Sequence, residues 1–359
     1  MTRAHRLAVF VAVFALAGTA PAQARRGGPA TPAAAADTGT IGYDVDGIRV
    51  IQRHTGSGDI VVANLYLLGG VRQVTAANAG IELMLLEASE RGTATYSRDR
   101  LRRTMAQLGT TISTQVGVDW SAIGLRATRA TLDSTWSILA SRITEPRFDS
   151  AEVGLIKRQL IAGVRQREDS PDAQVEFVAD SFAFHGHPYQ TSPSGTVTSL
   201  TRITVDDLQK YQKDQVVKSR MLLVVVGNIG RAHVERLVRG TIAKLPAGTY
   251  RWTLPDTLPR WKSGGLTINR DLPTNYILGL YPGPRADSPD YHALRIATAI
   301  LTGQLFSEVR SKRNLTYAVD APFIERAVSA GGLYVTTILP ETTLDVIRRE
   351  LSDLQTGTV

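Results

Sequence analysis

The amino-acid sequence predicts an α+β protein built from two similar domains. Short apolar runs bounded by Gly, Asn and Asp alternate with helical patterns, which is typical of sheets covered by helices. The second observation is a repeat: residues 60–87 and 275–301 share the order apolar strand, glycine-bearing exit, polar loop and apolar helix. Each domain is therefore expected to hold a mostly antiparallel sheet with helices packed on one side.

The elements of the first domain follow from local patterns. A strand-like run at 43–54, the turn TGSGD and an apolar run at 60–70 predict a hairpin. The pattern TTISTQVGVDWSAIGLRAT predicts a pair of strands, and MLLVVVGNIG predicts a buried strand. Helices are predicted at 77–91, 97–109, 131–144, 148–168, 172–184, 203–215 and 231–245. Ser170-Pro171 is expected to end the helix predicted at 148–168, because proline cannot continue a helix.

The ends of the chain and a Pro, Gly and Trp-rich stretch set the predicted domain bounds. A basic start, an apolar run and Ala22-Gln23-Ala24 indicate a secretory signal peptide. The predicted parts are signal 1–24, flexible tether 25–40, first domain 41–245, linker 246–264 and second domain 265–359. The second domain has about 95 residues against more than 200 in the first, so it is expected to be incomplete.

Composition excludes several classes of function. The chain has no cysteine, which removes disulfides, thiolate metal sites and thiol nucleophiles. Its formal charge of +8 falls to +6 without Arg3 and Arg6, and the remaining Lys and Arg are dispersed and not interleaved with aromatics. This indicates a mildly basic surface and no nucleic-acid partner. The signal peptide leads us to expect an exported, periplasmic or secreted protein, and no segment after it approaches membrane-spanning length.

The helix GIELMLLEASERGT, residues 80–93, is apolar and lies between a glycine exit and a Gly-Thr stop. Together with the segment 148–171, His-Pro-Tyr at 187–189 and LLVVVGN at 222–228, it resembles the pitrilysin/insulinase family of zinc peptidases. That family has His-x-x-Glu-His on this first helix. The two histidines and a glutamate on a distant helix would bind zinc, and the glutamate between the histidines would act as the base.

The resemblance implies that this zinc site is degenerate. Leu83 occupies the first histidine position, Leu86 the position of the catalytic glutamate, and Glu87 the second histidine position. The distal ligand position, 76 residues after Glu87, is Gly163. One carboxylate cannot hold zinc, and leucine cannot accept a proton. No catalytic residue, metal or cofactor is therefore expected in this chain, and zinc is expected in a partner.

Two other groups of polar residues are candidates for metal ligands. His185-Gly186-His187 is the one close histidine pair, but a packed loop element is the favoured interpretation. Glu82, Glu87 and Glu90 lie near one another on the degenerate helix, where solvated or hydrogen-bonded acids are expected rather than ligands.

The segment LFSEVRSKRNLTYAV, 305–319, resembles the second-domain element in which the family keeps an arginine and, seven residues later, a tyrosine. The corresponding residues are Arg310 and Tyr317. A guanidinium or phenol can stabilise negative charge on a carbonyl oxygen under attack and can hold a substrate backbone. The family's Ser-Arg-Leu run is replaced by the shorter Leu301–Leu305, so the loop before Arg310 is expected to differ.

The resemblance implies a non-catalytic subunit of a heterodimeric zinc peptidase, similar to one subunit of the mitochondrial processing peptidase and its bacterial homologues. Arg310 and Tyr317 would face the zinc of a homologous partner, and the first domain would bind extended peptide or unfolded protein. The alternatives are a structural or peptide-binding pseudoenzyme without a peptidase role and, third, an active metallopeptidase.

Overall fold

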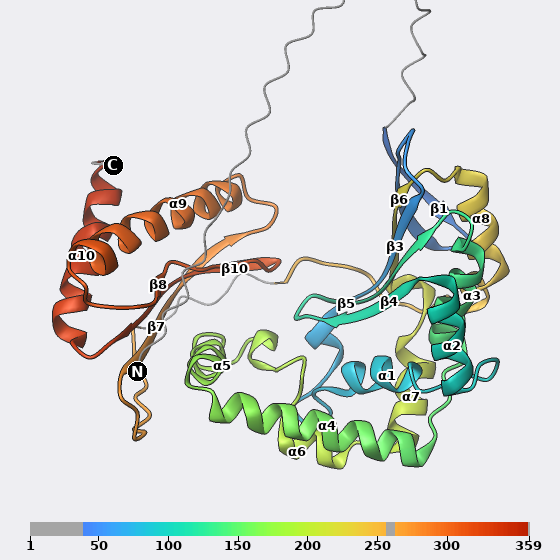
Figure 1. Ribbon diagram of the computed structural model, residues 1–359, viewed down its shortest axis with the longest axis horizontal. Helices are drawn as coiled ribbons and strands as arrows, with labels where there is room; N and C mark the ends of the chain where they lie inside the picture. The colour runs from blue at the N-terminus through green and yellow to red at the C-terminus, as the bar shows by residue number, and fades with distance from the viewer. Residues whose placement is uncertain (1–38, 256–262, 358–359) are drawn as a thin grey trace, which may run out of the picture. The chain divides into compact units, whose positions relative to one another are not determined.

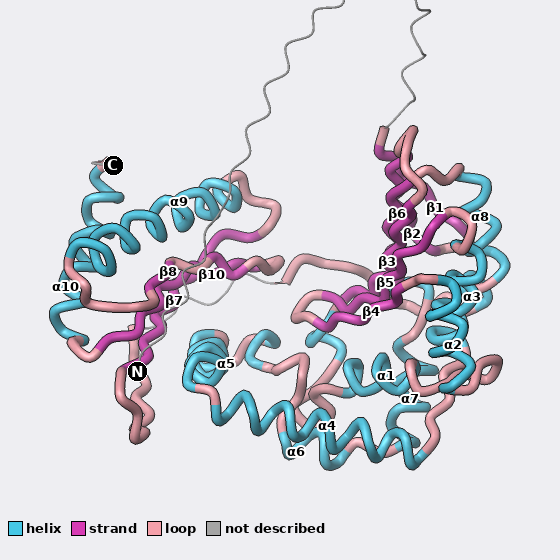
Figure 2. Tube along the Cα trace, in the orientation of Figure 1, coloured by secondary structure: helices cyan, strands magenta, loops and turns pink. Residues whose placement is uncertain are grey.

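The computed structural model describes residues 39–255 and 263–357, which form two sheets with associated helices (Figures 1 and 2). The predicted signal peptide, almost all of the predicted tether and residues 256–262 of the predicted linker lie outside the described residues. The mixed α+β class is confirmed. The proposed domain bounds and the incompleteness of the second domain stay predictions.

The first sheet has six strands in the order β1-β2-β6-β3-β5-β4. The strands are β1 Thr40–Val45, β2 Ile48–His54, β3 Ile60–Leu68, β4 Thr111–Val116, β5 Trp120–Thr128 and β6 Met221–Gly227. All neighbours are antiparallel except β2 and β6, which are parallel. Burial alternates along β3, as expected for a strand with one face on a core.

The predicted hairpin between residues 43–54 and 60–70 is wrong. The segment 43–54 belongs to two strands, because Asp46 and Gly47 have φ angles of 52° and 89° and form a tight turn between β1 and β2. The strands β2 and β3 are not neighbours, since β6 lies between them and pairs with both. A strand from far along the chain thus separates two runs that look locally like a hairpin.

Eight α-helices lie between β3 and residue 255 of the described chain. Their bounds are α1 Ile81–Ser89, α2 Arg98–Leu108, α3 Leu132–Thr144, α4 Ser150–Asp169, α5 Pro171–Ala183, α6 Val197–Arg202, α7 Val205–Gln215 and α8 Arg231–Gly240. Figure 1 shows α3 and α8 along one face of the sheet. Ser170 ends α4 and caps α5, which begins at Pro171, so the predicted stop is confirmed. The short helix α6 was not predicted.

Gly80 fixes the start of α1, the helix of the degenerate signature. Its φ of 88° lies in the left-handed region that side chains disfavour. A Cβ here would also lie 2.9 Å from the Leu200 side chain and 3.0 Å from the Cα atom of Gly195. Glycine at this position therefore lets α1 begin against the segment that leads into α6.

The second sheet has the order β7-β10-β8, with β9 paired to β10, and every pairing is antiparallel. Its elements are β7 Asn275–Arg285, α9 Asp290–Leu305, the π-helix η5 Phe306–Lys312, β8 Val319–Asp320, β9 Phe323–Ile324, β10 Val328–Thr337 and α10 Pro340–Thr356. Figure 1 shows α9 and α10 on one side of this sheet. The succession β7–α9 follows the same order as β3–α1, as the repeat predicts.

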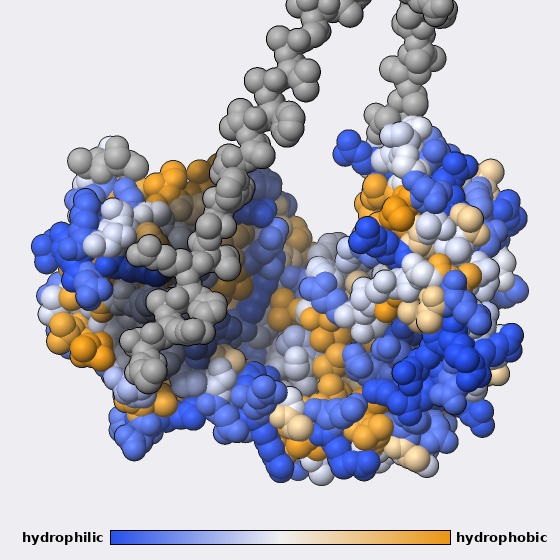
Figure 3. All heavy atoms as spheres, in the orientation of Figure 1, coloured by the Kyte–Doolittle hydropathy of each residue, from blue (hydrophilic) through white to orange (hydrophobic). Residues whose placement is uncertain are grey.

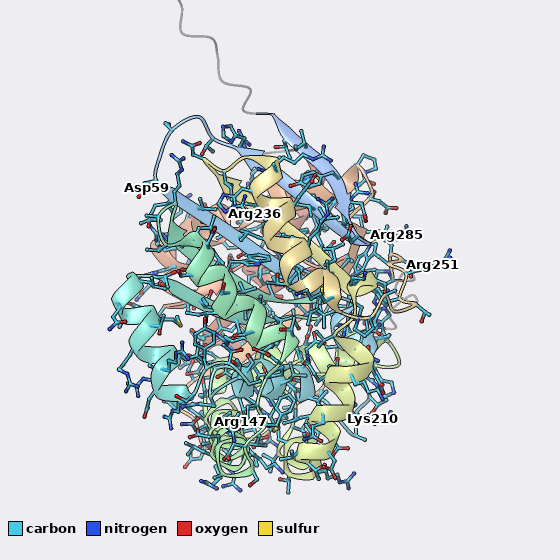
Figure 4. All side chains as sticks on the ribbon, turned by 90° about the vertical axis from the view of Figure 1, so that its right-hand side faces the viewer. Asp59, Arg147, Lys210, Arg236, Arg251 and Arg285 are labelled. Atoms are coloured by element: carbon cyan, nitrogen blue, oxygen red, sulfur yellow. The ribbon has the colours of Figure 1, made fainter. Side chains whose placement is uncertain are left out.

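Charged side chains are spread over the surface, and some exposed apolar side chains lie together. Arg147, Lys210 and Arg236 come from separate elements and lie at separate places on one face (Figure 4). Apolar side chains gather over the outer face of α9 (Figure 3), where Ile296 and Ile300 are exposed. Within the described ranges, none of the helices combines the length and the apolar character that crossing a membrane requires.

Candidate functional site

The degenerate positions lie on α1 and α4, which pack against each other. Leu86 is completely buried in the core of the first sheet's unit, whereas Leu83 and Glu87 are half-buried. Gly163 is exposed on α4, and a Cβ placed on it would meet no atom within 4 Å. The position expected for a base is thus part of the apolar core, while the three ligand positions keep access to solvent.

Glu82, the neighbour of the first degenerate position, belongs to a buried polar network. Its Oε2 atom accepts hydrogen bonds from the Tyr211 hydroxyl at 2.6 Å and from Arg220 Nη2 at 3.0 Å. The Arg220 side chain is 1% exposed and also donates to the Leu68 carbonyl at 2.7 Å. Burial raises the pKa of the Tyr211 hydroxyl, and the charge of Glu82 adds to this. The network ties α1 to α7 and to the start of β6.

Arg142 of α3 lies under the other end of α1. It is almost fully buried, and it donates to Ser89 Oγ at 3.2 Å and to the Leu86 carbonyl at 3.3 Å. Glu90 Oε2 lies 3.9 Å from its Nη2 atom. A cation beside the last carbonyls of a helix stabilises the negative end of the helix dipole. Burial lowers the pKa of Arg142, and Glu90 and Glu87 oppose that effect.

Sequence reasoning missed Arg142, Tyr211 and Arg220. One signal was present: each arginine stands alone in or beside an apolar run, SILASRIT and SRMLLVVV. A lone charge on a buried face needs a partner. The partners lie 53 residues away for Arg142 and Ser89, and 138 residues away for Arg220 and Glu82, so the pairs could not be assigned from spacing.

A cavity of about 470 Å³ opens beside the C-terminal end of α1. It is lined by Glu87, Glu90, Arg91, Arg98 and Arg102. Three guanidinium groups around two carboxylates make this a zwitterionic and slightly cationic site, in which a divalent cation is repelled.

The residues at the degenerate positions do not fit zinc. Glu87 supplies the one donor among them, and structural and catalytic zinc sites use at least three protein ligands. Glu87 Oε1 lies 3.5 Å from Thr114 Oγ1, its contact on β4. Among the residues that the structure describes, no three His, Cys, Asp or Glu side chains are grouped so that they could hold a metal ion.

His187 belongs to a packed loop, in agreement with the favoured interpretation. It is buried, its Nδ1 atom accepts from the Tyr189 amide at 3.2 Å, and its ring meets the Tyr189 ring at 4.5 Å between centroids. The Tyr189 hydroxyl donates to Asp119 at 2.5 Å. The other Asp119 oxygen accepts from the Ala327 amide at 2.8 Å, so Asp119 connects Tyr189 with the segment before β10.

Arg310 and Tyr317 are brought together by the structure. The guanidinium carbon of Arg310 lies 4.6 Å from the centroid of the Tyr317 ring and 4.7 Å from that of Phe306. Tyr317 is 82% exposed, which is unusual for so large a ring. In the described part of the chain, no group accepts a hydrogen bond from the Arg310 guanidinium or forms an ion pair with it. The side chain is charged and available to a ligand.

The segment before Arg310, where the sequence predicts a loop that differs from the family's, is helical. Leu301–Leu305 lies inside α9, which continues directly into the π-helix that carries Arg310. π-Helical turns are rare and often occur at functional sites. The chain then turns at Asn314, whose φ of 51° is tolerated best by Gly, Asn and Asp. The amides of Asn314 and Leu315 donate to the carbonyls of Arg310 and Val309, each at 3.0 Å, which closes the turn that leads to Tyr317.

A two-sheet α+β fold whose first helix lacks a zinc-ligand set is the arrangement that the resemblance to the pitrilysin/insulinase peptidases predicts. The comparisons with known proteins agree. Residues 202–359 match the family model described as the Peptidase M16 inactive domain. This match confirms the resemblance found in the sequence.

Curated relatives include zinc proteases and subunits of larger assemblies. An uncharacterized zinc protease of Bacillus subtilis is 20% identical over 76% of this chain, and a probable mitochondrial-processing peptidase subunit beta of Schizosaccharomyces pombe is 23% identical over 71%. Subunit 1 of the Caenorhabditis elegans cytochrome b-c1 complex is 22% identical over 54%. The matched parts cover 67%, 57% and 40% of these relatives.

Solved structures share the fold. The Peptidase M16 inactive domain of Pseudomonas fluorescens superposes with a TM-score of 0.78 at 19% identity, covering 88% of this chain and 79% of that one. The periplasmic protease PqqL of Escherichia coli gives a TM-score of 0.73 at 13% identity, covering 94% and 40%. At these identities the likeness supports the fold alone, and the roles of Arg310, Tyr317 and the degenerate positions stay predictions.

Proposed function

We propose that this chain is the non-catalytic subunit of a two-chain zinc peptidase. The observation that carries the proposal is the contrast between two sites. The positions that would bind zinc and activate water offer one carboxylate beside three arginines. Arg310 and Tyr317, by contrast, lie in contact, with the phenol exposed and no acceptor for the guanidinium among the described residues. Zinc and the base would be supplied by a homologous partner.

The chemistry assigned to this chain is charge stabilisation and peptide binding. When a nucleophile adds to a peptide carbonyl in the partner's site, negative charge develops on the carbonyl oxygen. Arg310 would donate hydrogen bonds to that oxygen, and the Tyr317 hydroxyl could donate a second. Substrates would be extended peptides or unfolded proteins. A sheet edge suits them, because β4 lies at the end of the first sheet and β5 is its neighbour there among the described strands.

The names of the relatives support the two-chain assembly and the compartment. One relative is a subunit of the mitochondrial-processing peptidase, and the matched family model is named an inactive domain. Export to the periplasm would follow from the signal peptide predicted at residues 1–24, and one solved neighbour is itself named a periplasmic protease. The mildly basic, scattered surface offers no support for a nucleic-acid partner.

The decisive experiment is coexpression with a zinc-bearing homologue from the same genome. We expect the two chains to copurify, each chain alone to be inactive, and the mixture to cleave a quenched fluorescent peptide. Arg310→Ala should lower kcat of the pair about 100-fold while the chains still copurify. Arg348→Ala on α10, where the arginine pairs with Asp345 at the surface, is the matched control and should leave kcat unchanged. Failure to copurify, or full activity of the Arg310→Ala pair, would refute the proposal.

A structural or peptide-binding protein without any peptidase role is the second candidate. It is favoured by the likeness to a subunit of the cytochrome b-c1 complex. This candidate predicts a stable assembly with a homologue in which Arg310→Ala alters no rate, since no cleavage occurs. An active metallopeptidase is disfavoured, because the donor set on α1 and α4 does not fit zinc.

A further inference from the structure

We propose that Phe306 is a positioning residue that, together with Tyr317, holds the Arg310 guanidinium by its two faces and leaves its N–H edge free for a ligand. The geometric part of this inference stands on the structure, and its role in peptide cleavage rests on the proposed function. Phe306 begins the π-helix, and Arg310 is four residues further along it.

The contacts of the guanidinium are with rings rather than with acids. Its carbon atom lies over both the Phe306 and Tyr317 rings, at 4.7 and 4.6 Å from their centroids. Each of the two rings thus contacts the guanidinium. An arginine that is held by a salt bridge uses its donors and its charge on that bridge. Stacking on aromatic faces holds the plane of the group and leaves all five N–H donors available.

The neighbouring acid is occupied elsewhere. Glu308 lies on the same π-helix, but its carboxylate accepts hydrogen bonds from Lys312 and Arg313. These two cations lower the pKa of the Glu308 carboxyl, with the Lys312 hydrogen bond as the larger cause. Glu308 is therefore ionised but already paired, and the positive charge of Arg310 is not neutralised by it.

Exposure separates Phe306 from an ordinary core residue. Its side chain is 47% exposed, so packing gives it little reason to be aromatic. Among the residues that the structure describes, the contact made by this ring is with the Arg310 guanidinium. The π-helical turn places residues 306 and 310 so that this contact forms, and the left-handed Asn314 returns the chain so that Tyr317 reaches the same group. The π-helical turn and the left-handed Asn314 are both rare backbone conformations, and together they bring Phe306, Arg310 and Tyr317 into contact.

The arrangement also defines what can bind. A guanidinium covered on its faces by rings accepts ligands only in its own plane, where pairs of parallel N–H donors match a carbonyl or a carboxylate. Because the rings fix that plane before a ligand arrives, less side-chain entropy is lost on binding. Removal of the Phe306 ring should therefore weaken charge stabilisation in the reaction more than it weakens substrate binding.

The test uses Phe306→Leu, which removes the ring, and Phe306→Tyr, which keeps it. Phe182→Leu is the matched control, because Phe182 of α5 is 48% exposed and lies outside this element. The first measurement is the ¹⁵N-detected Nε–H resonance of Arg310 in the full chain, assigned with Arg310→Lys. We expect Phe306→Leu to shift this resonance, because a ring current is lost, and both other variants to leave it in place. An unmoved resonance in Phe306→Leu would overturn the geometric proposal.

The second measurement is peptide cleavage by the reconstituted pair. Phe306→Leu should lower kcat roughly two- to fivefold with little change in KM, and Phe306→Tyr should restore it. In the Arg310→Ala background, Phe306→Leu should have no further effect. An equal loss in that background would show that Phe306 acts through packing and would overturn the positioning role. A pair that is inactive with every variant would refute the proposed function, while the resonance still decides the geometry.

Discussion

The guanidinium carbon of Arg310 lies 4.6 Å from the centroid of the Tyr317 ring, although seven residues separate the two positions in sequence. The contact means that the two residues form one element and should not be treated as independent donors. Tyr317 then has two separable features, a ring face that supports Arg310 and a hydroxyl that can reach a ligand.

Substitutions at Tyr317 should distinguish these features. Tyr317→Phe keeps the ring face and loses the hydroxyl, so we expect kcat of the reconstituted pair to fall about tenfold if the hydroxyl donates to the reacting oxygen. Tyr317→Leu removes the face as well, and an additional loss of roughly two- to fivefold is expected. Equal rates for the two variants would show that the ring gives no support to Arg310. Steady-state kinetics with one peptide substrate suffices.

The residues at the degenerate positions of α1 and α4 predict the zinc content of the chain. Wild-type chain should contain no stoichiometric zinc by plasma mass spectrometry, whereas Leu83→His/Glu87→His/Gly163→Glu should bind about one zinc per chain. These three positions are exposed or half-buried, and Gly163 has open space for a side chain, so the ligands can be accommodated.

The same variant should remain inactive as a peptidase. Position 86 is still leucine and fully buried, so no base is available to activate water. Zinc in the wild-type chain, with chelator-sensitive cleavage by that chain alone, would contradict both the interpretation of α1 and the proposed function. Absence of zinc from the triple variant would show that α1 and α4 are not placed as the family resemblance implies.

Local patterns in the sequence were sufficient for most helices, because caps and stops act over a few residues. Thr204 forms a reciprocal capping box with Asp207 at the start of α7, and Ser170-Pro171 separates α4 from α5. The order of strands could not be obtained in this way. The pairing of β6 with both β2 and β3 joins segments more than 150 residues apart, and no local signal states which strand will enter a sheet between two others.

Some features of the candidate site could likewise be predicted from the sequence, and others could not. Loss of the zinc positions could be read from residue types alone, since leucine and glycine carry no donor. The contact between Arg310 and Tyr317 depends on a π-helix and on a left-handed Asn314, and neither follows from propensity. The partners of Glu82 were also hidden, because a glutamate is normally expected in solvent and its cation comes from a distant element.

The buried pair of Glu82 and Arg220 should be important for stability. Glu82→Gln removes one charge and leaves the Arg220 guanidinium, 1% exposed, without a counter-ion. Breaking a buried pair in this way costs about 3–5 kcal/mol of the free energy of unfolding. Asp345→Asn on α10 is the control, because its ion pair with Arg348 is exposed on both sides and should matter by less than about 1 kcal/mol. Urea unfolding followed by circular dichroism measures both, and similar losses in the two variants would contradict a structural role for the Glu82 network.

Buried tyrosines predict a loss of stability in alkali. Burial is the main cause that raises the pKa of Tyr189 and of Tyr211. The hydrogen bond to Asp119 raises the pKa of Tyr189 further, and the charge of Glu82 does the same for Tyr211. In the unfolded chain these hydroxyls ionise near pH 10, so the folded state binds their protons more tightly. Their contribution is therefore fully present below about pH 10 and is lost as pH rises above it, by at most about 1.4 kcal/mol per pH unit for each group.

Tyr189→Phe tests the sign of this effect. The free energy of unfolding should be about 1–2 kcal/mol lower than that of the wild type at pH 8, because the hydrogen bond to Asp119 is gone. Between pH 10 and 11 the variant should lose stability less steeply than the wild type, since one proton linkage has been removed. Urea titrations at pH 8, 9, 10 and 11 give both quantities. Parallel pH dependences for the two proteins would mean that Tyr189 ionises alike in the folded and unfolded chains, against the burial that the structure gives it.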